Sequence, residues 1–144
     1  MNRLLLAVSL VVAGCGDARP VVGNTGNSAD TTTRVGPTGT KAADCAAAGL
    51  TGLTYSTFGQ AFATAWCIRC HDASKSGADR QGAPPDHNFN TYLGIQQFKD
   101  EIDQVAAMNP TGSQRNNFMP INDPRPPDEE RQKLACWIAT GLTQ

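Results

Sequence analysis

The sequence predicts an all-α domain of about three helices joined by long irregular stretches. Apolar side chains recur at helical spacing in three separate segments, and no stretch alternates polar and apolar residues as a half-buried strand would. About 100 residues follow a polar N-terminal region, which is enough for one small hydrophobic core. We therefore expect a single folded domain.

The first helix is expected to begin at Thr57, because Thr57 and Gln60 have the spacing of a capping box. Its apolar stripe is formed by five residues, namely Phe58, Ala61, Phe62, Ala65 and Trp66. These positions follow the i, i+3, i+4, i+7, i+8 pattern of one buried helix face.

The second helix is expected over residues 91–108, with Gly94 weakening its first turn. Its inner side is predicted to consist of Leu93, Ile95, Phe98, Ile102 and Val105. The acidic residues between them are expected to form a solvated face.

The third helix is expected to start near Pro127, which suits a first helical position, and to stop at Gly141. Three acidic residues follow the proline and favour the positive end of the helix dipole. The buried side is predicted to be Leu134, Trp137 and Ile138.

The first helix leads directly into Cys67-Ile68-Arg69-Cys70-His71, whose C-x-x-C-H spacing is typical of covalent c-type haem attachment. Two thiols at this spacing can reach the two vinyl groups of one porphyrin, and His71 can then ligate the iron. Two alternatives are a C-x-x-C disulfide and half of a zinc site. Zinc needs a second ligand pair, and only the isolated Cys45, Cys136 and His87 remain to supply one.

The N-terminus predicts export. A positive start, an apolar run over 4–12 and small residues before Cys15 resemble a bacterial lipoprotein signal. The run is too short for a spanning helix, which needs about 20 residues. We expect residues 1–14 to be removed and Cys15 to be lipidated; the alternative is an ordinary secretory signal with an incidental cysteine. Gly16 in place of aspartate favours the outer membrane over the inner one.

A tether is predicted between this anchor and the domain. The stretch from 16 to 43 has five glycines, six threonines and no aromatic residue, so it cannot bury enough apolar surface to fold. The predicted organisation is therefore a signal over 1–14, a lipid anchor and disordered tether over 15–43, and a folded domain over 44–144.

The remaining cysteines predict one disulfide bond. With Cys15 assigned to lipid and the motif cysteines to haem, Cys45 and Cys136 are left in an oxidising compartment, where disulfides persist. A bridge between them would close a loop of about 90 residues and stabilise the domain by about 4 kcal/mol. The alternative is two free buried thiols.

A methionine is the expected sixth ligand of the iron. Met119 precedes a proline in an Asn- and Pro-rich loop, 48 residues after His71, where it can reach back over the haem. Met108 ends an amphipathic helix and is better explained by packing. His87 would give bis-histidine ligation, but an exposed loop position is expected for it.

Together these features resemble small monohaem cytochromes c of the His/Met type, class I. The resemblance covers about residues 53–142 and rests on the motif region, the Met119-Pro120 pair and the last helix. It implies that the first and last helices cross near the haem edge, with Gly59, Phe62 and Trp137 at the contact. The long Pro- and Gly-rich loop over 74–90 departs from the family.

Charge limits the partners. Residues 44–144 carry 8 Lys and Arg against 11 Asp and Glu, a formal charge of −3, which argues against nucleic acid as a ligand. Arg80 and Arg115 are candidates for contacts with haem propionates. We expect a lipid-anchored electron carrier, not an enzyme, that holds one covalent haem c and serves unidentified redox partner proteins. The alternative is a haem enzyme subunit or a gas or redox sensor with a labile sixth ligand.

Overall fold

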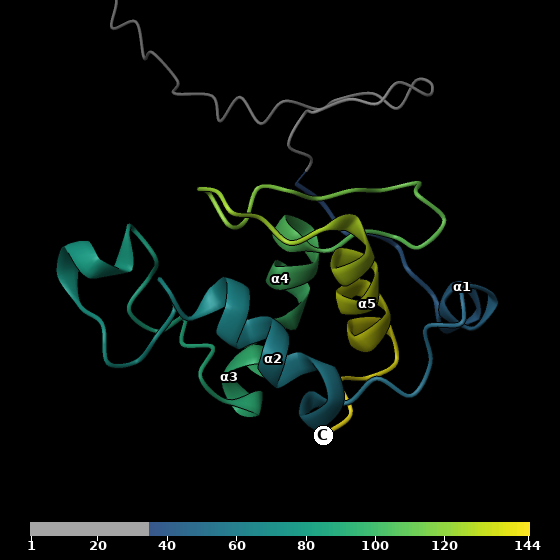
Figure 1. Ribbon diagram of the computed structural model, residues 1–144, viewed down its shortest axis with the longest axis horizontal. Helices are drawn as coiled ribbons and strands as arrows, with labels where there is room; N and C mark the ends of the chain where they lie inside the picture. Colours follow the sequence, from purple (N-terminus) through teal and green to yellow (C-terminus); the bar gives the residue numbers. More distant parts are fainter. Residues whose placement is uncertain (1–34) are drawn as a thin grey trace, which may run out of the picture. The chain divides into compact units, whose positions relative to one another are not determined.

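The computed structural model describes residues 35–144, and within this range the chain is helical and forms no strand (Figure 1). The all-α prediction is confirmed. The α-helices are α1 (Ala42–Ala47), α2 (Gln60–Phe62), α3 (Tyr92–Gln97), α4 (Lys99–Ala106) and α5 (Asp128–Ala139). Two π-helical segments, η1 (Tyr55–Gly59) and η2 (Ala63–Cys67), flank α2, and η3 (Gly77–Arg80) is a 3₁₀ turn.

The predicted signal over 1–14, the lipidation site Cys15 and the tether up to residue 34 lie outside the described residues. Within the described range, no helix has the length and apolar character needed to cross a membrane.

The first helix begins three residues before the predicted start. Thr54 is its N-cap and shares a reciprocal capping box with Thr57: each backbone N–H donates to the other's hydroxyl, at 3.0 and 3.1 Å. The helix then runs without interruption through η1, α2 and η2 to Cys67.

Wide turns at both ends of this helix change which residues face the core. The N–H of Ile68 donates to the carbonyl of Ala63, five residues back, as in a π-helix. The predicted α-helical stripe is therefore only partly correct. Phe62 is buried, but Ala61 and Ala65 are exposed, and Ala63 is buried in their place.

The predicted second helix is two helices, α3 and α4, with a break at Phe98. Phe98 leaves helical geometry, and its ring stacks on the imidazole of His87 with 3.9 Å between the ring centroids. Ile95 and Ile102 are buried as predicted, whereas Leu93 is 69% exposed. The break contains no proline or glycine, so tertiary packing of Phe98 explains the interruption.

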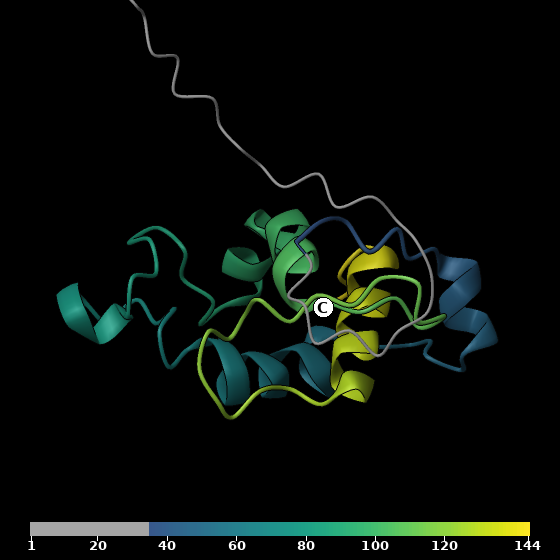
Figure 2. The ribbon, with the colours of Figure 1, turned by 90° about the horizontal axis from the view of Figure 1, so that it is seen from above.

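Helix α5 lies beside α4 in both Figure 1 and Figure 2 and carries the centre of the core. Trp137 is fully buried, and its indole N–H donates to the carbonyl of Thr143 at 3.0 Å. A Cβ atom on Gly59 would overlap the Trp137 ring. The first and last helices therefore meet at the expected glycine, which is buried in η1.

The folded domain starts earlier than Asp44. The N–H of Gly36 donates to the carbonyl of Gln104, and the backbone and hydroxyl of Thr38 donate to the carboxylate of Asp103 at 2.8 and 2.7 Å. The end of the predicted tether is thus bound to the domain, and Asp103 is not part of a purely solvated face.

Helix α1 follows this segment and is joined to α5 by a disulfide. Cys45 and Cys136 are bonded, with their Cα atoms 5.5 Å apart, and both are completely buried. The predicted pairing is confirmed.

Two long irregular segments separate the helices. We name residues 72–90 the proximal segment and residues 109–126 the distal segment. The proximal segment, which includes η3, projects away from the helices in both ribbon views (Figures 1 and 2). The distal segment connects α4 to α5.

Candidate haem-binding site

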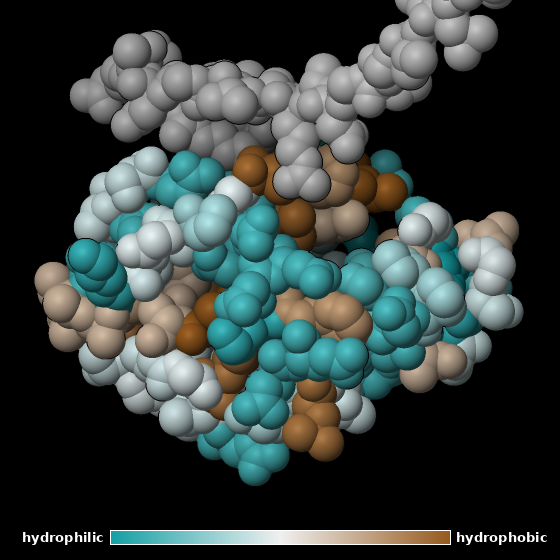
Figure 3. Space-filling view, turned by 180° about the vertical axis from the view of Figure 1, so that it is seen from behind, coloured by the Kyte–Doolittle hydropathy of each residue, from teal (hydrophilic) through white to brown (hydrophobic). Residues whose placement is uncertain are grey.

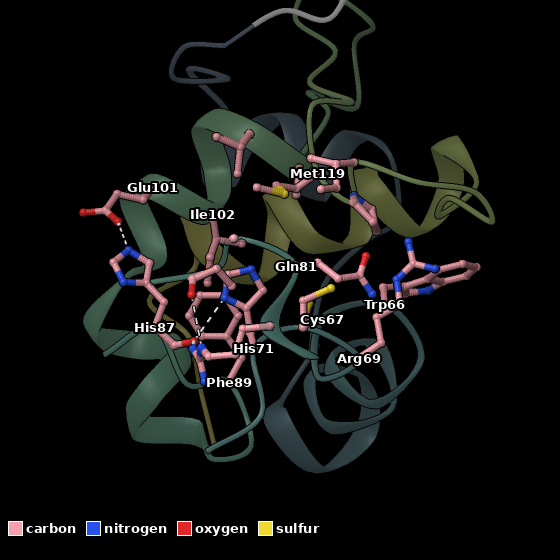
Figure 4. A pocket seen from close by; sticks show the side chains of 18 of the residues that line it. Trp66, Cys67, Arg69, His71, Gln81, His87, Phe89, Glu101, Ile102 and Met119 are labelled. Carbon is pink, nitrogen blue, oxygen red and sulfur yellow. Dashed lines mark hydrogen bonds and ion pairs between the residues drawn. The ribbon is translucent and has the colours of Figure 1, made fainter. Parts of the chain in front are cut away.

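A cavity of about 440 Å³ lies between the first helix, α4 and the two irregular segments. Figure 4 shows Met119 across this cavity from Cys67 and His71. Much of its wall is apolar and is formed by Phe62, Phe89, Ile102, Val105, Ala106 and Pro126. The sequence motif and the loop methionine therefore line one apolar cavity.

His71 has its Nδ1 atom fixed by the proximal segment. Nδ1 lies 3.0 Å from the carbonyl oxygen of His87, which can only accept a hydrogen bond, so the proton must be on Nδ1. This leaves the lone pair on Nε2 for a metal. Desolvation by burial lowers the pKa of His71 and favours the neutral ring that a ligand must be. The ring also stacks on Phe89, with centroids 4.5 Å apart.

The two motif cysteines stand at the end of η2 and just after it. Both are half-buried, line the cavity and form no disulfide. Burial raises the pKa of the Cys67 thiol to about 12, against an opposing effect of Arg69. The C-x-x-C disulfide is thus not formed here. No three His, Cys, Asp or Glu side chains of residues 35–144 gather in a group that could hold a zinc ion.

Met119 is positioned by contacts to two helices. Its N–H donates to the carbonyl of Val105 on α4 at 2.9 Å, and its carbonyl accepts from Arg131 on α5 at 3.1 Å. Met108, the other methionine considered, does not line the cavity.

His87 is half-buried, with 23% of its side chain exposed, so the expectation of an exposed loop histidine is wrong. Its Nε2 lies 3.0 Å from a carboxylate oxygen of Glu101 and its Nδ1 lies 2.9 Å from Asp86. Because its backbone carbonyl holds the Nδ1 atom of His71, His87 lies on the side of His71 that faces away from Nε2. This position does not suit a sixth ligand.

Arg80 organises the proximal segment from its interior. It is 5% exposed, and all five of its guanidinium N–H groups are hydrogen-bonded. The acceptors are the carbonyls of Asp72, Ala83, Pro84 and His87 and the amide oxygen of Asn88. One of these, the His87 carbonyl, is the same atom that holds His71. Arg80 lines the cavity, but its five bonds leave no free donor, so a contact with a haem propionate would have to replace one of them.

Hydrogen bonds at the cavity rim connect the distal segment to the motif and to the proximal segment. The guanidinium of Arg69, between the motif cysteines, donates to the carbonyl of Asn122 at 2.5 Å, and the amide of Asn122 donates to Gln81 at 3.2 Å. Near this rim Phe118 and Ile121 are each 43% exposed. On the face drawn in Figure 3 most of the surface is hydrophilic, and hydrophobic residues gather in a few places, among them beside a hollow at the upper right.

Arg115 is bound elsewhere. It pairs with Asp128 at 2.8 Å and does not line the cavity, so a propionate contact by Arg115 finds no support in this geometry. Sequence reasoning missed Arg131, which is completely buried and donates to the backbone carbonyl of Met119. A helical arginine beside an apolar stripe usually reaches solvent, so the pattern gave no signal.

The chain matches the cytochrome c family over residues 56–141, more than half of its length. The protein belongs to the cytochrome c family. No curated protein and no solved structure shows a significant match to the chain. The matched range begins inside η1 and ends two residues after α5, so it contains the whole cavity wall and all of the ligand candidates.

The residues of this cytochrome fit the haem c that the family binds covalently. Two unpaired thiols, a neutral imidazole with its Nδ1 proton committed, and a thioether all border one apolar cavity. These are the attachment and axial groups that a c-type haem uses. The donor set and the apolar wall therefore agree with the family.

Proposed function

We propose that this cytochrome is a monohaem single-electron carrier of the class I, His/Met type. Cys67 and Cys70 would form the two thioether bonds, and His71 and Met119 would ligate the iron from opposite sides. The observation that carries the proposal is that Met119, 48 residues after His71, borders the same cavity as the motif.

Bound haem would supply a reversible one-electron couple, and the chain supplies its surroundings. The His87 carbonyl holds the Nδ1 proton of His71, which keeps the ring in one tautomer and orientation. The apolar wall limits water, and a thioether ligand favours the reduced state. Both effects raise the reduction potential, which suits a single-electron carrier.

We further propose that the carrier is attached to the cell envelope by a lipid on Cys15 and exchanges electrons with redox partner proteins there. The support is the sequence of the N-terminus, with its short apolar run before Cys15. Gly16, in place of aspartate after the cysteine, favours the outer membrane over the inner one. Cys15→Ser should prevent acylation and release the domain from the membrane fraction while haem attachment continues.

The test of ligation is Met119→Ala in the haem-loaded protein. We expect the wild-type ferric form to show a methionine-to-iron charge-transfer band. The variant should lose this band, have a lower reduction potential and bind CO when reduced. Met108→Ala is the matched control and should keep the band, because Met108 does not line the cavity.

Two results would overturn the proposal. Haem that is extracted by acid-acetone after denaturation would contradict covalent attachment through the motif. A wild-type ferrous protein that binds CO as readily as Met119→Ala would favour the sensor or enzyme with a labile sixth ligand.

A further inference from the structure

Arg131 is a buried guanidinium held by backbone carbonyls. It is 0% exposed, and its Nη1 atom donates to the carbonyls of Ala106, Asn116 and Met119 at 2.6, 2.7 and 3.1 Å. Its Nε atom donates to the carbonyl of Pro126 at 3.2 Å. Three of these four acceptors belong to the distal segment.

No carboxylate of residues 35–144 forms an ion pair with Arg131, and Asp128 acts on its charge only from beyond ion-pair distance. The nearby acidic residues of α5 have other partners: Asp128 pairs with Arg115, and Glu130 accepts from the indole of Trp66 at 2.5 Å. A buried charge without an ion-pair partner is costly unless hydrogen bonds compensate it. Backbone carbonyls bond Nε and Nη1 of Arg131, while Nη2 has no hydrogen-bond partner in residues 35–144. Compensation of this charge therefore depends on a few carbonyls, most of them in the distal segment, and their positions are tied to the guanidinium.

These bonds determine where Met119 lies. The distal segment has no helix or strand of its own, and a single bridge between Met108 and Arg115 is its one ladder contact in the described chain. The two backbone polar groups of Met119 are bound by different helices, the N–H by Val105 of α4 and the carbonyl by Arg131 of α5. Loss of the second contact would free the carbonyl end of the residue.

We propose that Arg131 is a positioning residue for Met119 and that its fixed charge raises the reduction potential. The inference rests on the ligation proposed above. Bound haem would give one electron to a partner protein on oxidation and would then carry one more positive charge, with no bond or proton exchanged. A cation held beside the axial residue disfavours that extra charge, and the low dielectric of the interior strengthens the effect.

The test compares Arg131→Met, Arg131→Lys and the control Arg115→Met in the full-length, haem-loaded protein. Arg115 is also on the distal segment, and its loss removes the same charge from a partly exposed site. Two readouts are measured: the midpoint reduction potential, and the temperature at which the methionine-to-iron band disappears while the haem stays attached.

Arg131→Met should lower both quantities. Arg131→Lys keeps the charge but cannot reproduce the planar fork, so it should restore the potential toward wild type while the band still disappears at a lower temperature. Arg115→Met should change both quantities much less than Arg131→Met, because the Arg115 side chain is partly exposed and is bound to Asp128. This separation of potential from band stability would not arise if Arg131 only supported the fold.

The inference is overturned if Arg131→Met and Arg115→Met have the same potential and the same band stability. If Arg131→Met does not fold, Arg131→Lys decides: a band as stable as that of wild type refutes the positioning role. A wild-type protein with no methionine band would instead refute the proposed ligation itself. The two failures are thus distinguishable.

Discussion

The proximal and distal segments differ in how completely the buried arginine that holds each one is hydrogen-bonded. Each is irregular, each carries a group that faces the cavity, and each is organised around one buried arginine. Arg80 uses all five donors on the proximal segment, whereas Arg131 leaves its Nη2 atom unpaired. The other buried side-chain atom without a partner in residues 35–144, Oδ1 of Asn117, is also in the distal segment.

This difference suggests that the two sides of the cavity differ in rigidity. On the proximal side the Arg80 network is saturated and includes the His87 carbonyl that accepts from Nδ1 of His71, and the proposed thioether bonds lie beside it. The distal side depends on a few bonds to α4 and α5. Regions with incompletely satisfied polar groups open more easily than saturated ones. We therefore expect Met119 to be released before His71 under any destabilising condition.

The largest effect is expected from Arg80→Met. It leaves several acceptors of the proximal segment without a donor, and at about 1–3 kcal/mol for each buried one the loss of unfolding free energy should be about 5 kcal/mol. Chemical denaturation measures this. Lys75→Met removes the same charge from the same segment, and equal losses in the two variants would show that the Arg80 network is not what holds the segment.

The disulfide should contribute about 4 kcal/mol, and its removal should affect the distal side more, because Cys136 and Arg131 share helix α5. Cys45→Ser, Cys136→Ser and the double variant should be equally destabilised. Hydrogen exchange should show a greater loss of protection at the amide of Met119 than at that of Phe89, which is bonded to the His71 carbonyl. The reverse order would contradict the comparison.

A smaller effect is expected from Gly94→Ala, which tests the close packing of the proximal segment against α3. A Cβ atom at Gly94 would overlap the backbone carbonyl oxygen of Asn88, whose side chain accepts from Arg80. Only a backbone shift can relieve this overlap, so we expect the unfolding free energy to fall by about 2 kcal/mol, as measured by thermal denaturation. Leu93→Ala, at an exposed neighbouring position, is the control. Unchanged stability in Gly94→Ala would mean that the segment moves freely there.

The smallest effect is expected from Glu101→Gln, which weakens the contact with His87. The Glu101 side chain is 62% exposed, so the pair should stabilise the protein by only about 0.5 kcal/mol. Denaturation at low and high salt measures the contribution, which should disappear as salt is added. A loss greater than that of Gly94→Ala would place His87 among the residues that hold the proximal segment.

The groups that face the cavity were predictable from local sequence because their chemistry depends on residue type and spacing. The C-x-x-C-H run, Met119 before a proline and the Cys45–Cys136 pair needed no knowledge of tertiary contacts. The lack of strands and the glycine opposite Trp137 were also predictable. The thioether bonds and the axial roles themselves stay predictions.

The supporting residues were not predictable, because their positions depend on contacts across the fold. The π-turns of η1 and η2 changed which face of the first helix is buried. As a result Ala63, which an α-helical period assigns to solvent, is buried, and Ala61 and Ala65 are exposed. Stacking of Phe98 on His87 divided the expected second helix. Arg131 belongs to a residue type that is rarely buried, and its acceptors come from segments up to 25 residues away.

The placement of the four cysteines in residues 35–144 has a consequence for maturation. Four thiols allow three disulfide connectivities, and a wrong one would consume the sulfurs that haem attachment requires. Packing of α1 on α5 encloses Cys45 and Cys136 completely, while Cys67 and Cys70 stay at the cavity wall with no bond between them. The fold thus separates the sulfurs into a bonded pair enclosed between α1 and α5 and an unbonded pair at the cavity wall, where thioether bonds to haem would form.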